Sequence, residues 1–175
     1  MHESEIELLI YNVAQGDRLA LEQLYIQMKQ RIYLLAYSIT KSKQDAEDVL
    51  HDTFICLSKK AKSYKGKNQA EQWILRIARN KALDLYRKNK RQEKDNIDDF
   101  TNIVSLDNCS NSNLIVEDSL QILNVKERQI VMLHCTYEST HKEIAIIMQL
   151  PEGTVRRTYA NSIKKLCKEF SNREE

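Results

Sequence analysis

Arginine, asparagine and aspartate side chains recur at helical spacing in WILRIARNKALDLYRKNKR, residues 73–91. Apolar residues recur there too, so one face turns inward and the other is more exposed. The more exposed face carries Arg76, Arg79, Asn80, Asp84 and Arg87. Arginine contacts phosphates, whereas asparagine and aspartate can recognise base edges. The face therefore suits a nucleic acid, although Asp84 fits equally well as an ion-pair partner of Arg87 or Lys88.

A polar and partly aromatic loop, SYKGKNQ at residues 63–69, comes directly before this helix. The helical spacing of apolar residues stops there, around Gly66. An aromatic ring can stack on a base that has left the duplex, and polar groups can hydrogen-bond to its edge. We therefore expect Tyr64, Lys65 and Asn68 to contact an unstacked base.

Near the C-terminus, HKEIAIIM, QLPE and GTVRRTYANSIKKL predict a helix, a tight turn and a second helix. The only proline of the chain, Pro151, lacks an N–H and suits the start of that second helix. This pattern is typical of a helix-turn-helix, whose second helix enters the major groove of DNA. The alternative is an ordinary helical hairpin with a solvated face.

The outer side of the second helix carries side chains that can contact DNA. Arginine pairs with guanine and asparagine with adenine, and a helix N-terminus favours a nearby phosphate. The candidate contacts are Thr154, Arg156, Arg157, Ala160, Asn161 and Lys164. Tyr159 could stack on a base, but its spacing from Val155 places it in the core.

Three carboxylates share one helical face in DAEDVLHDTF, residues 45–54. Asp45, Asp48 and Asp52 lie at positions i, i+3 and i+7, which spreads them over about 10 Å of helical rise, too far for one metal ion. We expect an acidic stripe for a basic partner, with a solvated face as the alternative.

No residue set predicts catalysis or a metal centre. His134, Cys135 and His141 are conceivable ligands, but their spacing fits no closed zinc pattern and the first two lie in an apolar helix. A nucleophile–base set and a glycine-rich phosphate loop are both missing from the sequence. We therefore expect no metal, no cofactor and no small-molecule substrate.

The charge is unevenly distributed along the chain, although the net charge is only +2. Residues 59–94 carry 13 basic and 3 acidic side chains, whereas residues 1–58 and 95–140 are both net acidic. A basic block between acidic blocks favours a local site for a polyanion. A well-solvated basic helix is the alternative.

Helical spacing of apolar residues along the chain, with only three glycines and one proline, predicts an all-α fold. Helices are expected over residues 5–15, from an Asp17 cap to residue 39, over 43–62, and from the loop to about residue 90. Periodicity then vanishes in an acidic stretch rich in asparagine and serine. We expect a domain over residues 1–92, a flexible acidic linker over 93–113 and a helical domain over 114–175.

The cysteines and the N-terminus bear on the compartment. The four cysteines are scattered without a CxxC pair, which favours reduced thiols in a cytoplasmic protein. The first residues, MHESEIELLI, are acidic, and no apolar run reaches the length of a bilayer span. We expect neither a signal peptide nor a membrane anchor.

Together these motifs resemble an extracytoplasmic-function (ECF) sigma factor, the small type within the sigma-70 family of bacterial transcription initiation factors. DAEDVLHDTF, WILRIARNKALDLYRKNKR and KEIAIIMQLPEGTVRR stand in the order of the family and at roughly its spacing. The match covers nearly the whole chain except the linker. A rival interpretation is a stand-alone helix-turn-helix regulator, but such a regulator would not need the basic helix of the first domain.

The resemblance implies a role for each part. The first domain would be sigma region 2, with Asp45, Asp48, Val49, Asp52 and Thr53 docking on the clamp of the largest subunit of core RNA polymerase. The loop and the basic helix would recognise and melt the −10 element of promoter DNA. The second domain would be sigma region 4, which reads the −35 element and meets the polymerase flap. The linker would follow the RNA-exit path, and family members commonly have an anti-sigma factor as a further partner.

The sequence departs from the family pattern at a few positions. Members usually carry additional basic residues where this chain has Thr158, Asn161 and Ile163. The turn usually has a glycine where Gln149 stands, and a glutamine is common in place of His51. The first two departures bear on the −35 sequence and on DNA binding by the free protein.

Overall fold

A computed structural model describes residues 2–66, 68–95 and 122–173. These residues form helices and no strand, which confirms the all-α prediction. The elements are α1 (His2–Ala14), α2 (Arg18–Thr40), α3 (Lys43–Lys60), the 3-10 helix η1 (Ala61–Ser63), α4 (Ala70–Asp95), α6 (Val125–Tyr137), α7 (His141–Met148) and α8 (Glu152–Arg173). Within these ranges, no helix has both the length and the apolar character that crossing a membrane requires.

Side-chain caps fix where several helices begin. Asp17 caps α2 as predicted, since its Oδ1 accepts hydrogen bonds from the backbone N–H groups of Leu19 at 2.8 Å and Ala20 at 3.3 Å. α6 and α7 each begin with a capping box, formed by Asn124 with Glu127 and by Thr140 with Glu143. Residues close in sequence therefore set these helix boundaries.

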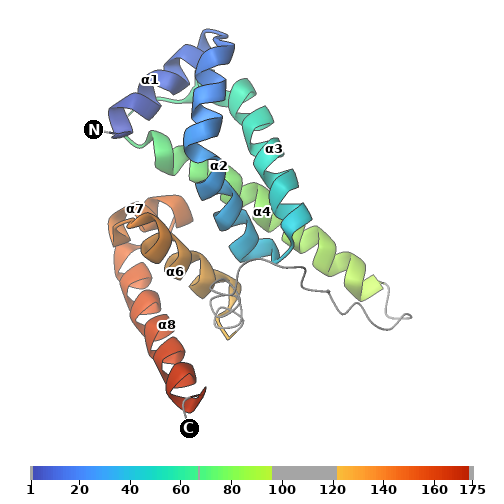
Figure 1. Ribbon diagram of the computed structural model, residues 1–175, viewed down its shortest axis with the longest axis vertical. Coiled ribbons are helices and arrows are strands. Elements are labelled where there is room, and N and C mark those ends of the chain that lie inside the picture. The colour runs from blue at the N-terminus through green and yellow to red at the C-terminus, as the bar shows by residue number, and fades with distance from the viewer. Residues whose placement is uncertain (1, 67, 96–121, 174–175) are drawn as a thin grey trace.

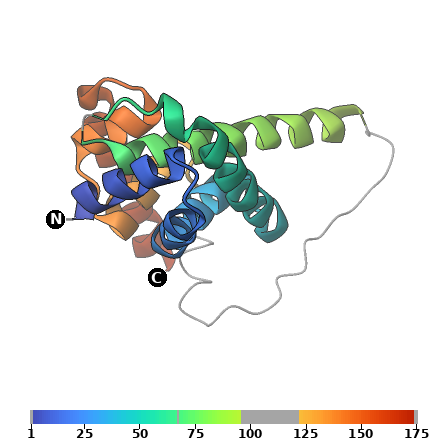
Figure 2. The ribbon, with the colours of Figure 1, turned by 90° about the horizontal axis from the view of Figure 1, so that it is seen from above.

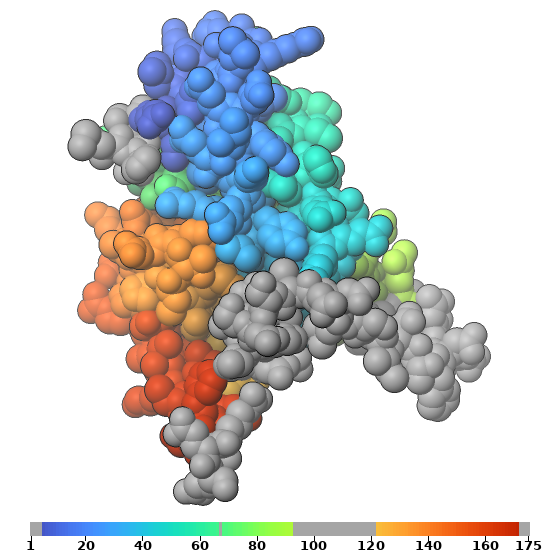
Figure 3. All heavy atoms as spheres, in the orientation of Figure 1, coloured from blue at the N-terminus to red at the C-terminus, as the bar shows by residue number. Residues whose placement is uncertain are grey.

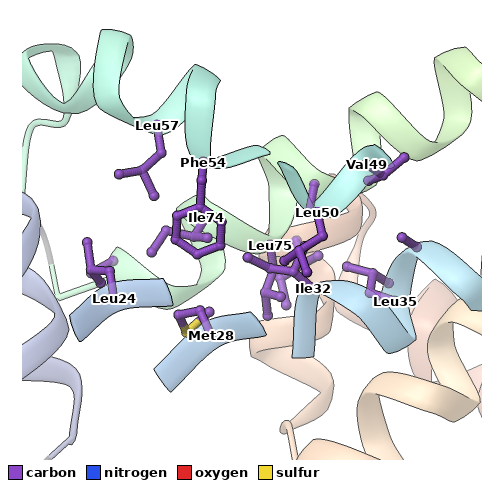
Figure 4. Close-up of a cluster of buried hydrophobic side chains, with 14 of the residues drawn as sticks. Leu24, Met28, Ile32, Leu35, Val49, Leu50, Phe54, Leu57, Ile74 and Leu75 are labelled. Carbon is purple, nitrogen blue, oxygen red and sulfur yellow. The ribbon is translucent and has the colours of Figure 1, made fainter. Parts of the chain in front are cut away.

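The core of the first domain forms where α2, α3 and α4 meet. Figure 4 shows the apolar side chains of α2, among them Met28 and Ile32, facing Phe54 of α3 and Ile74 and Leu75 of α4. Ile32 and Ile74 have no exposed surface. The helical spacing of these residues builds one continuous apolar layer, and α1 packs against it along the N-terminal part of the domain.

α4 is longer than the sequence predicted and extends beyond the bundle. It continues to Asp95, past the expected end near residue 90. In Figure 2 its C-terminal half projects as an arm away from the other helices. Most of the expected linker, residues 93–113, lies outside the described residues. The first residues of the expected second domain, 114–121, lie outside them as well.

The two helical domains pack directly on each other, which the sequence did not indicate. α6 lies against α2 and α7 lies against α4 (Figure 1), and the atoms of the two domains meet in the space-filling view (Figure 3). Ile130, Leu133 and Ile144 are fully buried in the same cluster as the core of the first domain. The cluster therefore extends across the domain boundary.

Two polar side chains of α6 fasten this interface to the backbone of α2. The Arg128 guanidinium, which is almost fully buried, donates from Nε to the Ser38 carbonyl at 2.9 Å and from a terminal nitrogen to the Leu123 carbonyl at 2.8 Å. Burial lowers the pKa of Arg128. The Tyr137 hydroxyl donates to the Arg31 carbonyl at 3.2 Å, and burial raises the pKa of Tyr137. The contacts of Arg128 with Ser38 and of Tyr137 with Arg31 join residues 90 and 106 positions apart, so both depend on the packing of the two domains.

We predict that Arg128→Ala lowers the free energy of unfolding by about 2–3 kcal/mol, because it removes charge-assisted hydrogen bonds and leaves the buried Ser38 carbonyl without its donor. Urea denaturation followed by the fluorescence of Trp73, the only tryptophan, measures the change. Lys126→Ala is the matched control, since Lys126 lies on the same helix and is exposed. Equal stabilities of the two variants would contradict the structural role of Arg128.

Candidate nucleic-acid interface

The basic face of α4, defined as Arg76, Arg79, Asn80, Asp84 and Arg87, is only partly open to solvent. Asn80, Asp84 and Arg87 are exposed, whereas Arg76 and Arg79 are half-buried. Asp84 pairs with Arg87 across one turn, with Oδ1 3.4 Å from the guanidinium. Both side chains of this pair are well exposed, so solvent screens the attraction and either partner can be released at little cost.

Arg79 is covered by the second domain, which corrects the expectation that it lies on the exposed side. Its Nε donates to Gln129 Oε1 of α6 at 2.7 Å, and Gln129 Nε2 donates in turn to the Val125 carbonyl at 3.0 Å. Burial lowers the pKa of Arg79, and the positive charge of Arg87 lowers it further. The periodicity of α4 alone could not reveal this cover, because it comes from a helix 50 residues away in sequence.

The loop before α4 forms one wall of a hollow that suits a planar base. A cavity of about 290 Å³ is lined by Ser63, Tyr64, Lys65, Gly66, Gln69, Trp73, Arg76 and Ile146. The Tyr64 and Trp73 rings are tilted against each other with centroids 5.1 Å apart, and Lys65 and Asn68 are exposed beside them. Aromatic rings and a guanidinium are groups on which an unstacked base can stack.

The helix-turn-helix has the predicted elements. The Pro151 carbonyl accepts hydrogen bonds from Thr154 N at 2.9 Å and Val155 N at 3.2 Å, and α8 begins at Glu152. Pro151 therefore caps α8 at its start, as predicted, in the position just before the first helical residue. Gln149 closes α7 in the left-handed region, with φ +55°.

The recognition face of α8, defined as Arg156, Arg157, Ala160, Asn161 and Lys164, is exposed throughout, as predicted. Thr154 is partly buried at the start of the helix. Arg156 forms an i,i+4 ion pair with Glu152 at 2.9 Å, which holds this guanidinium near the helix start. Arg157 stands next to it on the open surface. The face therefore presents two guanidinium groups and one amide to a groove.

Tyr159 belongs to an aromatic cluster inside the second domain, consistent with the core placement predicted for it. Its ring packs edge-on against His134 of α6 and His141 of α7, with centroids 4.4 Å and 5.3 Å apart. Burial raises the pKa of Tyr159, as do the charge of Cys135 and a hydrogen bond with it. Within the described residues, no three His, Cys, Asp or Glu side chains are grouped to hold a metal ion.

The acidic stripe of α3, defined as Asp45, Asp48 and Asp52, borders a groove between α3 and α4. Asp48 and Asp52 are exposed, and Asp52 pairs with Lys81 of α4 at 3.4 Å. Asp45 is half-buried and its Oδ2 accepts a hydrogen bond from Asn89 Nδ2 at 2.9 Å. The groove has a volume of about 520 Å³ and mixes acidic side chains with Lys81 and Lys88.

Two further residues that the family resemblance assigned to polymerase contact lie in the core. Val49 is 2% exposed and Thr53 is fully buried. The Thr53 hydroxyl donates to the Val49 carbonyl at 2.7 Å, which satisfies it inside the helix. Val49 nevertheless lies beside the exposed carboxylates, at the floor of the groove that Asp48 and Asp52 border. With so little exposed surface, the two residues mainly support the acidic stripe from within the core.

Residues 24–92 match the family described as Sigma-70 region 2, and residues 113–166 match Sigma-70, region 4. The ECF RNA polymerase sigma factor SigM of Mycobacterium tuberculosis is 27% identical over 165 residues, which cover 94% of this chain and 84% of SigM. SigW of Bacillus subtilis is 26% identical over 170 residues, which cover 88% of this chain and 90% of SigW. This chain belongs to the sigma-70 family as an ECF sigma factor.

Solved sigma factors share the fold of this sigma factor. The structure of CnrH in complex with the cytosolic domain of CnrY matches with a TM-score of 0.73 and 21% identity, covering 96% of this chain and 98% of CnrH. The sigma factor RpoE of Bartonella quintana, in complex with the anti-sigma factor NepR, matches with a TM-score of 0.75 and 20% identity, covering 86% and 96%. The arrangement of helices is therefore that of known sigma factors.

Three residues of this sigma factor that border the predicted sites escaped the sequence-based prediction. Gln129 holds Arg79, Ile146 lines the cavity beside the loop, and Glu7 contacts the loop from α1. Each acts across a long sequence separation and carries no motif of its own. Only the tertiary structure brings them to the sites.

We predict that Gln149→Gly raises the free energy of unfolding by about 1 kcal/mol, because glycine adopts positive φ without the steric cost that a side chain incurs. Thermal and urea unfolding of purified protein measure the change. Gln23→Gly is the control, since Gln23 is exposed inside α2, where glycine lowers helical stability by up to about 1 kcal/mol. A Gln149→Gly variant no more stable than the wild type would contradict strain at this turn.

Proposed function

We propose that this ECF sigma factor binds core RNA polymerase and directs it to promoters, where it recognises the −10 and −35 elements and initiates DNA-templated transcription. The observation that carries the proposal is the presence of two separate DNA-compatible helical faces and an exposed acidic stripe on one chain of this family. The chain itself makes and breaks no bond. It acts in the cytoplasm by supplying binding energy for promoter choice and strand opening.

Each surface takes one part of this task. The acidic stripe of α3 binds the clamp of the largest polymerase subunit, with Asp48 and Asp52 as its exposed carboxylates. The basic face of α4 and the preceding loop bind and melt the −10 element. The recognition face of α8 reads the −35 element while the second domain meets the polymerase flap. Residues 93–113 connect the two readers along the RNA-exit path.

Two domains that each bind DNA weakly bind more tightly when both are held on one polymerase. Once the first has bound, the second acts at a high effective concentration, and the two demand promoter elements at a fixed spacing. Unpairing a base costs a few kcal/mol, which stacking and hydrogen bonds in the hollow beside Tyr64 and Trp73 can offset.

The packing of the two domains bears directly on promoter recognition. Gln129 accepts a hydrogen bond from Arg79, and Ile146 of α7 lines one side of the hollow beside the loop. A duplex and its −10 bases therefore need α6 and α7 to leave α4 before they can meet the whole basic face. Binding of the first domain to the polymerase clamp and of the second to the flap supplies the energy for that separation.

An anti-sigma factor is a further partner that the structural relatives suggest. CnrH was solved with the cytosolic domain of CnrY, and RpoE with NepR. A protein that covers the acidic stripe of this sigma factor would compete with polymerase. The exposed Asp48 and Asp52 favour a partner with basic side chains at the contact.

We predict that Asp48→Arg reduces co-purification with core RNA polymerase at least tenfold and abolishes promoter-specific run-off transcripts, because a positive charge replaces an exposed carboxylate of the stripe. Glu22→Arg on α2 is the control, with the same charge change at an exposed position away from α3. Unchanged co-purification of the Asp48 variant would contradict the docking surface. Tight, sequence-specific promoter binding by wild-type protein without polymerase would contradict the sigma function and favour a stand-alone regulator.

We predict that Arg157→Ala relaxes the −35 preference by about 5- to 150-fold at one base pair, because a bidentate arginine–guanine contact provides about 1–3 kcal/mol of discrimination. Transcription from promoters with each −35 position varied measures it. Lys168→Ala, at an exposed site farther along α8, is the control. A uniform loss across all −35 sequences would show that Arg157 contacts phosphate only.

A further inference from the structure

Glu7 of α1 is positioned to organise the loop that precedes α4. Its Oε1 accepts a hydrogen bond from the Tyr64 hydroxyl at 3.0 Å and another from the backbone N–H of Asn68 at 3.3 Å. The same oxygen lies 3.4 Å from the position that a Cβ on residue 66 would occupy. One carboxylate oxygen therefore accepts two hydrogen bonds from the loop and leaves little room for a side chain at position 66.

A third hydrogen bond extends this contact to the end of the loop. The Tyr64 hydroxyl, which donates to Glu7, accepts from the backbone N–H of Gln69 at 3.3 Å. The Tyr64 ring is also held against Trp73 of α4. The two ends of the loop are thereby joined through the Tyr64 hydroxyl to the Glu7 carboxylate.

The loop turns through the left-handed region at two residues, where Gly66 is free of steric cost but Asn68 gains from support. Gly66 has φ +75° and Asn68 has φ +51°, in the left-handed region that most residues avoid. A carboxylate is an acceptor with two oxygens, so it can take both an O–H and an N–H donor. Hydrogen bonds to a charged acceptor are stronger than neutral ones, which makes glutamate an effective anchor for this conformation.

The anchor itself is fixed to the core of the first domain. On α1, the neighbouring residues Ile6 and Ile10 are 3% and 1% exposed and belong to the main hydrophobic cluster. Glu7 is partly buried between this helix and the loop, and a cavity of about 390 Å³ lies beside it, lined in part by Tyr11 and Tyr64. The position of the carboxylate is therefore set by packed helices.

We propose that Glu7 is a positioning residue, which holds the loop in the conformation that selects a base of the −10 element. The inference rests on the proposed function of the loop. A base that leaves the duplex gains most from donors and acceptors that are already in place, because ordering a mobile loop on binding costs free energy. Without Glu7 the loop samples other conformations and discriminates less between bases.

The test compares Glu7→Ala with Glu7→Gln in run-off transcription by core polymerase plus full-length protein, on promoters with each −10 base varied. We expect Glu7→Ala to reduce the preference for the best base at one −10 position at least fivefold. Glu7→Gln should retain most of that preference, since its amide oxygen still accepts hydrogen bonds. Glu5→Ala is the matched control, because Glu5 lies on the same helix and accepts a hydrogen bond from Gln27 of α2 at 3.0 Å.

The preference ratio separates positioning from stability, since a merely destabilised protein loses transcription equally on all promoters. A uniform loss for Glu7→Ala, or an equal change in the ratio for Glu5→Ala, would overturn the proposal.

A double variant of the loop, Lys65→Ala with Asn68→Gly, tests the −10 role of the loop separately from the positioning role of Glu7. Glycine replaces Asn68 because it tolerates the positive φ at this position. If the loop variant changes the −10 preference and Glu7→Ala does not, Glu7 has no positioning role and the loop keeps its function. If neither changes it, the −10 role of the loop fails, and the role of Glu7 fails with it. If no promoter-specific transcript forms with wild-type protein, the sigma function itself fails.

Discussion

The structure depends on the enclosure of α6, in which residues 127–133 are buried without interruption. A helix on the surface of a domain buries one stripe, so seven consecutive buried residues require neighbours on every side. α7 and α8 cover α6 within the second domain, and α2 covers it from the first. The domain interface is therefore needed to bury this helix, and the positions of Arg79, Ile146 and the loop cavity follow from it.

The polar residues at this interface make it suited to separation. Arg128 and Gln129 each have hydrogen-bond partners across or beside the boundary, and water can replace those partners once the domains part. Glu127 is also buried, and burial alone would raise its pKa. The hydrogen bond from Lys165, the hydrogen bond from the Asn124 backbone and the charge of Lys165 outweigh burial, so the pKa of Glu127 is lowered. This ion pair stays within the second domain. Separation therefore exposes groups that water solvates well, alongside a limited set of apolar side chains such as Ile130.

Local patterns in the sequence predicted the elements, and long-range contacts account for what they missed. Periodicity located the helices, the Asp17 cap and the exposed recognition face of α8, because each depends on residues within a few turns. The family resemblance assigned Val49 to a partner contact, whereas the structure buries it in the core. Arg79 was expected on an open face because nothing in residues 73–91 reveals that Gln129 packs there. The contact of Glu7 with the loop also escaped prediction. Tyr64 lies 57 positions and Asn68 lies 61 positions after Glu7 in the sequence.

The partner of Arg79 indicates how the packed arrangement can give way to DNA. Gln129 offers a neutral amide oxygen, whereas a phosphate offers a charged one, which adds an ion pair to the hydrogen bond from the guanidinium. Burial lowers the pKa of Arg79, and a phosphate beside the guanidinium would raise it. Exchanging Gln129 for phosphate is therefore favourable at this side chain. An acidic residue in place of Gln129 would hold Arg79 more tightly and oppose the exchange, so a neutral side chain at this position suits a surface that must be covered in one state and bind DNA in another.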